Sequence, residues 1–220
     1  MIRMPQIFLW CSALAMALLS PAHAYERGDW LVRAQIAGTH TEPGGDGLTT
    51  TGLNNAQFDY SEQWRLAVQV DYMLLDGLSL GVSAPLEAFR HRLFIDDGDA
   101  SQRMMDVEVL PLTVSAAWYL PKWRSLRARL IGAWQYGDVS NDRYRSGSVP
   151  GISDASLDNY SGPGIGLGIE WDRDSHWSWD FAITQFALSQ QVNIVTVGGT
   201  TSLDVDPQIL NWSLGLTRRF

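Results

Sequence analysis

One segment of the chain, residues 64–74, alternates in chemical character at every position. A β-strand sends successive side chains to opposite faces, whereas a helix with 3.6 residues per turn mixes alternate positions. Taken as a strand, the segment has one wholly apolar face, made by Trp64, Leu66, Val68, Val70, Tyr72 and Leu74. The opposite face contains Arg65, Gln69 and Asp71, so the sequence predicts a strand with one apolar and one polar side.

Seven further segments share this alternation, and the connections between the eight segments alternate in length. The predicted strands cover residues 29–40, 63–75, 78–91, 105–120, 125–137, 160–172, 177–189 and 207–220. Three connections are short turns, and four are long and polar, spanning 41–62, 92–104, 138–159 and 190–206. Outer-membrane barrels have short periplasmic turns and long extracellular loops. We therefore predict an all-β fold, an eight-stranded antiparallel up-and-down transmembrane β-barrel with both termini on the periplasmic side.

The apolar faces of the predicted strands contain no charged residue, and aromatic residues gather where the strands end. A charged Arg or Lys on the lipid face of a barrel costs roughly 2–4 kcal/mol at the bilayer midplane, and amphipathic rings favour headgroup depth. The predicted periplasmic girdle comprises Trp30, Tyr72, Trp118, Trp171, Trp177, Trp179 and Phe220, and the opposite girdle comprises Trp64, Trp134 and Tyr136. A soluble β-sandwich is the alternative, but its aromatic residues have no reason to gather at strand ends.

The first residues have the composition of a secretory signal peptide. Arg3 is followed by an apolar run over residues 7–19, shorter than the roughly 20 residues that span a bilayer, and then by an A-x-A pattern ending at Ala24. We expect residues 1–24 to be cleaved, which leaves residues 25–220 as the barrel domain and removes the one cysteine of the chain. The expected location is the outer membrane of a Gram-negative cell.

The overall charge and the scattered histidines argue against several kinds of partner and cofactor. A formal net charge of −8 argues against nucleic acid, whose phosphates need a basic face. No cofactor or metal is expected, because His40, His91 and His176 lie apart without ligand spacing, and the acidic run at 96–99 does not match a calcium loop. The expected partners are outer-membrane lipid and lipopolysaccharide, small apolar solutes, and the barrel-assembly machinery through the C-terminal strand that ends in Phe220.

Charged residues fall on the inward faces near the periplasmic end of the predicted barrel. They are Arg33, Asp71, Arg127, Arg129, Glu170 and Asp180. Three cations and three anions at similar height are expected to pair, since a lone buried charge is severely penalised and the planar fork of Arg suits carboxylates. We predict that these six residues form a salt-bridged floor across the lumen.

Towards the long connections the inward-facing residues become apolar. They are Phe89, Met105, Val107, Val109, Ile131, Phe186, Leu188 and Ile209. The interior of an eight-stranded barrel is either filled by side chains or holds one small ligand. This upper lumen is therefore either a pocket for an apolar molecule or a set of side chains that pack on one another, and composition leaves both open.

Several short motifs occur in order along the predicted barrel domain. They are Gly28-Asp29-Trp30-Leu31-Val32-Arg33-Ala34, Phe89-Arg90-His91, Leu110-Pro111-Leu112-Thr113 followed by Trp118-Tyr119, Ile131-Gly132-Ala133, and Asp206-Pro207 before a strand ending in Phe220. The ordered set resembles the OmpW/AlkL family of small outer-membrane barrels. The family pattern has a proline directly before Phe-x-His, whereas Ala88 stands there and Pro85 lies three residues earlier.

The resemblance implies a narrow barrel with a hydrophobic passage that admits small apolar molecules from outside and releases them sideways into the membrane. Pro85 and Pro111 form a candidate lateral seam for this release. Both face inward, each lies 13 residues from Gly98, and neither can donate a ladder hydrogen bond. Ordinary bulges are the alternative explanation of both prolines.

Two other functions stay open at this point. The barrel can be a structural or receptor protein whose long surface loops bind a partner. It can also be a lipid-modifying enzyme that uses His91 beside a loop serine, although no spacing in the sequence fixes such a pair. We predict a passage for small hydrophobic molecules and no enzymatic activity.

Overall fold

The computed structural model describes residues 25–42, 57–60, 63–96, 101–144, 152–174, 176–196 and 198–220. The strands within these ranges are β1 Trp30–Glu42, β2 Gln57–Tyr60, β3 Gln63–Leu75, β4 Leu78–Pro85, β5 Phe89–Asp96, β6 Ser101–Tyr119, β7 Leu126–Tyr144, β8 Ile152–Leu157, β9 Tyr160–Asp172, β10 Trp177–Ala187, β11 Gln190–Thr196, β12 Gly199–Val205 and β13 Gln208–Arg219. In the same ranges, no helix is long and apolar enough to cross a membrane. The expected signal peptide, residues 1–24, lies outside the described residues.

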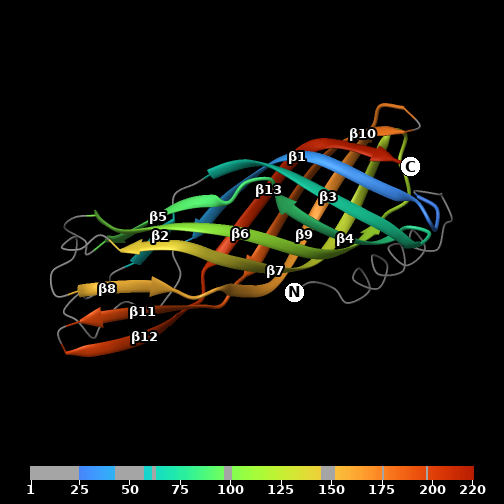
Figure 1. Cartoon of the computed structure of the whole chain (residues 1–220). Coiled ribbons are helices and arrows are strands. Elements are labelled where there is room, and N and C mark those ends of the chain that lie inside the picture. The colour runs from blue at the N-terminus through green and yellow to red at the C-terminus, as the bar shows by residue number, and fades with distance from the viewer. Residues whose placement is uncertain are drawn as a thin grey trace, which may run out of the picture.

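Eight strands close into an antiparallel barrel, as the alternation predicts (Figure 1). Hydrogen-bonded neighbours follow the order β6-β4-β3-β1-β13-β10-β9-β7, and the pairing of β6 with β7 closes the ring. β5 continues the path of β4 after residues 86–88 and also pairs with β6. Each barrel strand corresponds to one predicted segment, so the fold class and the number of barrel strands are confirmed.

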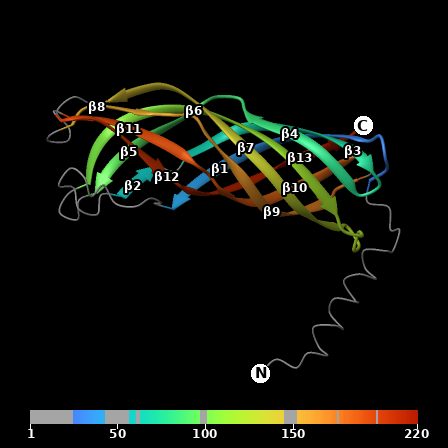
Figure 2. The same cartoon turned by 90° about the horizontal axis from the view of Figure 1, so that it is seen from below.

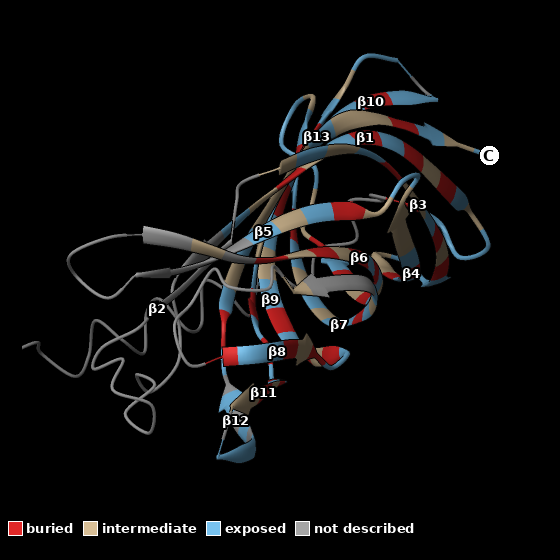
Figure 3. Cartoon of the chain, turned by 60° about the vertical axis from the view of Figure 1, so that its left-hand side comes forward, coloured by how far each residue is buried: buried red, intermediate tan, exposed pale blue. Residues whose placement is uncertain are grey.

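Large apolar side chains cover the outer surface of the barrel. Along its strands buried positions alternate with exposed ones (Figure 3). Ile165, Leu130 and Val114 are 76, 50 and 50 % exposed although they lie within strands. A soluble β-sandwich would bury such residues between its sheets, whereas lipid tails cover them on a membrane barrel. The outer surface therefore faces the bilayer.

Aromatic residues lie on the outer surface near the short turns. Trp30 and Tyr72 are cross-strand neighbours with ring centroids 4.9 Å apart, and Trp171 pairs with Trp179 across β9 and β10. Phe220 is exposed at the same end, where its backbone forms hydrogen bonds with that of Trp30. These are the positions of an interfacial aromatic girdle.

The end of the barrel opposite the C-terminus carries additional β-structure (Figure 1, Figure 2). There β8, β11 and β12 form a separate three-stranded antiparallel sheet, and β2 pairs with β5. The expectation of long loops is therefore wrong for much of 92–104, 138–159 and 190–206. These segments contain the end of β5, the start of β6, the end of β7 and all of β8, β11 and β12. The reason is packing. Val192 and Ile194, on either side of the polar Asn193, bury their side chains in an apolar cluster with lumen residues, and the polar residues around them give the segment the composition of a loop.

Candidate functional site

The six charged residues of the predicted floor lie in one cluster near the short turns. Arg33 on β1 forms ion pairs with Asp71 on β3 and with Glu170 on β9, the latter at 2.8 Å between Nη2 and Oε1. None of the six is more than 5 % exposed: Arg33, Asp71, Arg127, Arg129, Glu170 and Asp180. Charges buried to this extent are costly unless each contacts an opposite charge.

Two arginines of β7 reach the floor from the wall opposite β1. Arg129 donates from Nη1 to Glu170 Oε1 at 2.9 Å and from Nη2 to Asp180 Oδ1 at 3.1 Å. Arg127 makes longer contacts, 3.4 Å from Nη1 to Glu170 Oε2 and 3.5 Å from Nη2 to Asp172 Oδ2. Glu170 thus contacts all three arginines of the floor. An ion or solute crossing the floor would have to separate these pairs.

Two tyrosines that the alternation did not assign to the floor also contact it. Tyr25, which precedes β1, donates its hydroxyl to Glu170 Oε2 at 2.6 Å, and Arg33 Nη2 donates to the Tyr119 hydroxyl at 2.6 Å. The guanidinium of Arg127 lies 4.0 Å from the Tyr25 ring centroid. Burial raises the pKa of Tyr25, so its hydroxyl remains a neutral donor. The inward position of Tyr119 on its strand was a usable signal, whereas alternation says nothing about a residue before the first strand.

Two glycines leave room for the side chains of the floor. A Cβ atom at Gly168 would lie 2.7 Å from the guanidinium carbon of Arg129, and one at Gly81 would overlap the Asp71 carboxylate. Because side chains in a closely packed interior have little space to yield, a substitution at either position would displace the floor. A Cβ atom at Gly132, by contrast, would have no neighbour within 4 Å.

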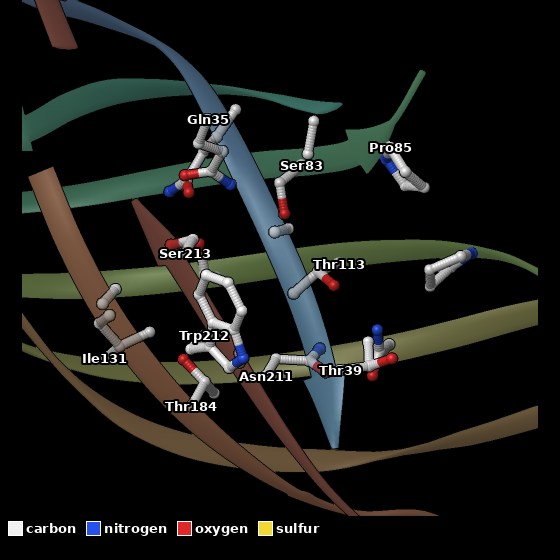
Figure 4. Close-up of a pocket in the computed structure, with 18 of the residues that line it drawn as sticks. Gln35, Thr39, Ser83, Pro85, Thr113, Ile131, Thr184, Asn211, Trp212 and Ser213 are labelled. Atoms are coloured by element: carbon white, nitrogen blue, oxygen red, sulfur yellow. The ribbon is translucent and has the colours of Figure 1, made fainter. Parts of the chain in front are cut away.

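A cavity of about 100 Å³, here called the lower cavity, is lined by side chains from several barrel strands (Figure 4). Arg129 of the floor is also among its lining residues. Its polar lining residues include Gln35, Thr39, Ser83, Thr113, Gln135, Thr184, Asn211 and Ser213. Of the eight apolar residues predicted for the upper lumen, Phe89, Ile131 and Phe186 line this cavity. The wall of the lower cavity therefore combines polar and apolar groups.

The other predicted apolar residues of the lumen lie in two settings. A smaller cavity of about 20 Å³, the upper cavity, is lined by Phe89, Val107, Val109 and Ile209 among others. Met105 and Leu188 line neither cavity and belong to a buried apolar cluster. That cluster also contains residues of the separate three-stranded sheet, namely Ile152, Ala155, Leu157, Val192 and Ile194. Some of the predicted residues thus border open space, and others pack on one another.

The hydrogen-bonded ladder on one side of β6 is interrupted beside the lower cavity. Pairing of β4 with β6 ends at Ser83 and Thr113, and pairing of β5 with β6 begins at Phe89 and Val109. Five residues on the path from β4 to β5 therefore face three residues of β6 without a ladder pair. We call this interruption the ladder gap.

Two prolines occupy the ladder gap, which comprises residues 84–88 and 110–112. Extending the register of β4 and β6 by two residues puts Pro85 opposite Pro111, and both line the lower cavity. Proline has no N–H group, so neither residue can supply a donor to bridge the gap.

The segment at the ladder gap stays attached to β3 on its other side. Leu86 N donates to Leu66 O at 2.8 Å, and Arg65 Nε donates to Ala88 O at 3.4 Å. Cross-strand pairing with β3 also continues as far as Pro85, opposite Ala67. The gap therefore separates this segment from β6 and leaves its connection to β3 in place.

The residues considered for other chemistry lie apart from the floor. The ring centroid of His91, on β5, lies 5.9 Å from that of Phe89. Within the described ranges, no group of three or more His, Cys, Asp or Glu residues is arranged to hold a metal ion. Residues 97–99 of the acidic run lie outside these ranges.

The fold and the lumen define a class of protein. A closed antiparallel barrel with an apolar outer surface and an aromatic girdle near its short turns is an eight-stranded outer-membrane β-barrel. Comparison with known proteins gives the family. Residues 26–220 match the OmpW family, and the chain belongs to that family.

Individual relatives agree with this assignment. Outer membrane protein W of Vibrio cholerae serotype O1 is 24 % identical over 173 residues, which cover 76 % of this chain and 78 % of that protein. The crystal structure of OprG from Pseudomonas aeruginosa matches with a TM-score of 0.76 at 18 % identity, over 90 % of this chain and 98 % of OprG. The solid-state NMR structure of AlkL in lipid bilayers gives 0.69 at 14 % identity, over 91 % and 94 % of the two chains. Family and fold together locate the chain in the outer membrane of a Gram-negative cell, among its lipids.

Proposed function

We propose that this barrel is a narrow passage for the passive uptake of small hydrophobic molecules, which leave it sideways into the membrane. The observation that carries the proposal is the position of the lower cavity, which lies between a floor of paired charges and the ladder gap. A solute in this cavity has ions below it and a weakened part of the wall beside it. The resemblance to the OmpW/AlkL barrels implies the same kind of solute.

The floor makes a direct exit to the periplasm unfavourable for an apolar solute. Arg33, Arg129 and Glu170 are at most 2 % exposed. Glu170 forms an ion pair of 2.8 Å with Arg33 and one of 2.9 Å with Arg129. A hydrocarbon passing between them would break these contacts and replace none of them. A sideways exit avoids that cost.

The side chains around the ladder gap support such an exit. Leu86, Leu110 and Leu112 face the membrane there and are 64, 43 and 45 % exposed. A solute that leaves the lower cavity through the gap therefore meets apolar side chains and then lipid tails. Because the ladder is missing at this point, fewer backbone hydrogen bonds oppose a local separation of the strands.

Uptake of a small apolar ester, ethyl acetate, by cells that contain a cytoplasmic esterase tests the proposal, with release of acid as the readout. The initial rate of hydrolysis is expected to be higher in cells that produce the barrel than in cells that do not. In Pro85→Ala with Pro111→Ala, two backbone donors return to the gap, and uptake is expected to fall. Pro163→Ala, an exposed proline on β9, is the matched control and is expected to keep wild-type uptake.

Gel mobility of the unboiled protein would establish that each variant is folded. Equal uptake with and without the barrel would contradict the proposed function. Wild-type uptake by a folded Pro85→Ala, Pro111→Ala barrel would contradict an exit at the ladder gap.

A further inference from the structure

We propose that the middle of the lumen recognises small uncharged amphiphiles, molecules with one hydrogen-bond donor and a short apolar tail, of which primary alcohols are the simplest. This inference rests on the proposed function and narrows its substrate class. The site is the junction between the lower and upper cavities, here called the neck. Five residues line both cavities and form it: Thr39, Phe89, Pro111, Gln135 and Asn211.

One side of the neck is polar and has unused hydrogen-bond acceptors. Thr39 Oγ1, Gln135 Oε1 and Asn211 Oδ1 are buried atoms without a hydrogen-bond partner in the described part of the chain. Thr39 and Asn211 are cross-strand neighbours on β1 and β13, and Gln135 comes from β7 on the opposite wall. Gln135 is only 3 % exposed. A buried acceptor without a partner is penalised, so a guest that donates a hydrogen bond relieves that penalty.

Another amide side chain of the lumen, that of Gln69, is already hydrogen bonded. Gln69 also lines the lower cavity, but its Nε2 donates to Asp71 Oδ1 at 2.9 Å. It therefore belongs to the network of the floor. The side-chain oxygens of Gln135 and Asn211 have no such bond, so a guest that donates to them displaces no existing partner.

The other side of the neck is apolar. Phe89 and Pro111 come from β5 and β6, at the edge of the ladder gap. A guest with its hydroxyl towards Gln135 and its tail towards Phe89 satisfies both sides. An alkane of the same size would leave the polar oxygens unpaired, and sites built around a hydrogen bond discriminate strongly against analogues that lack the donor.

Charge and volume restrict the guest further. Arg129 is the one charged residue among those lining the lower cavity, and it is already paired with Asp180 and Glu170. An ionised guest would therefore find no free counter-charge there. The lower cavity has a volume of about 100 Å³, and an apolar cavity of about 150 Å³ holds benzene. The neck and lower cavity thus suit about four to six non-hydrogen atoms.

Titration of the full barrel with two isomers tests this inference. 1-Butanol and methyl propyl ether contain the same atoms, but only the alcohol can donate a hydrogen bond. In detergent-solubilised protein with labelled Ile and Leu methyl groups, Ile131 reports binding in the lumen. Its neighbour Leu130, which faces outward, reports partition into the detergent. We expect saturable shifts at Ile131, with the alcohol binding about tenfold more tightly than the ether.

Gln135→Leu removes one acceptor with little change in size. It is expected to weaken butanol binding about tenfold and to leave the ether unaffected or tighter. Gln185→Leu makes the same change on the outward face of β10 and is expected to alter neither affinity. Asn211→Leu is the second variant if the first fails to fold. Equal affinities for the two isomers, or shifts confined to Leu130, would overturn the inference.

The binding measurement is independent of uptake because it uses the purified barrel. Selective butanol binding without any increase in the uptake of either butanol or the ester by cells would contradict the proposed function and support the neck as a binding site. Increased ester uptake by cells, without a preference of the purified barrel for butanol over the ether, would support the proposed function and contradict the neck as a binding site.

Discussion

Arg129 holds the carboxylate of Asp180 through two hydrogen bonds, one of them 3.1 Å from Nη2 to Oδ1, and both side chains are at most 2 % exposed. The same guanidinium also donates to Glu170 at 2.9 Å. Glu170 and Asp180 are cross-strand neighbours on β9 and β10, and Arg129 contacts both of these buried anions. Its removal would leave the three carboxylates of the floor with only two arginines, so one buried negative charge would lose its compensation.

Arg129→Ala is therefore expected to lower the free energy of unfolding of the barrel by roughly 3–5 kcal/mol, the usual cost of breaking a buried pair. Urea unfolding in lipid vesicles, followed by tryptophan fluorescence, measures this change. Arg90→Ala is the matched control, because Arg90 pairs with Glu108 at 2.8 Å but is 77 % exposed. Its expected effect is at most about 1 kcal/mol. If the two variants had equal stability, the floor would not be the ion-paired structure described.

Gly168→Ala tests the same network without removing a charge. The added Cβ would lie 2.7 Å from the guanidinium carbon of Arg129, and overpacking of this kind costs about 1–3 kcal/mol. The unfolding measurement applies again. Gly132→Ala, with nothing within 4 Å of the new atom, is expected to be neutral or slightly stabilising. Wild-type stability of Gly168→Ala would mean that Arg129 does not lie against this strand.

Tyr25→Phe removes the hydroxyl that donates to Glu170 at 2.6 Å and keeps the ring. A hydrogen bond to a buried charged group contributes about 1.5–3 kcal/mol, and a loss of this size is expected in the unfolding free energy. Tyr136→Phe is the control, since the hydroxyl of Tyr136 accepts a hydrogen bond from Asn159 at an exposed position. No difference between the two variants would remove Tyr25 from the floor.

Cysteine labelling tests the orientation of the barrel in the membrane. Thr200→Cys lies on β12 of the three-stranded sheet, which we predict to be extracellular, and is expected to react with an impermeant thiol reagent on intact cells. Asp76→Cys lies in the short turn between β3 and β4 and is expected to react only after the outer membrane is permeabilised. The natural cysteine, Cys11, is part of the segment expected to be cleaved. The opposite labelling pattern would invert the topology.

The barrel strands could be predicted because lipid and lumen make opposite demands on alternate residues. Arg129 lies between Ala128 and Leu130, and this contrast alone assigns its side chain to the inside. The same alternation predicts that the charged residues of the floor lie on the inward face of each strand. Their similar distance from the short turns indicated that they share one level.

The features that escaped prediction depend on register or on contacts outside the barrel strands. The alternation of apolar and polar residues assigns the side chains of Gln135 and Asn211 to the lumen. That they meet at one level of the lumen follows from the strand register, which the alternation does not give. The ladder gap arises from an unequal number of residues facing β6, and the sequence alone shows only its two prolines. The three-stranded sheet of β8, β11 and β12 could not be predicted, because its polar residues resemble those of ordinary loops.

A reversible lock on the ladder gap tests the account most directly. Ala84→Cys with Leu112→Cys places two cysteines just beyond the last pair of β4 and β6, and Val82→Cys with Val114→Cys places the control pair within the intact ladder. Ester uptake is measured on the same cells under oxidising and then reducing conditions. The account predicts that oxidation of the first pair lowers uptake to that of cells without the barrel, that reduction restores it, and that the control pair has no effect. Full uptake through a barrel whose gap is closed by a disulfide would contradict lateral release.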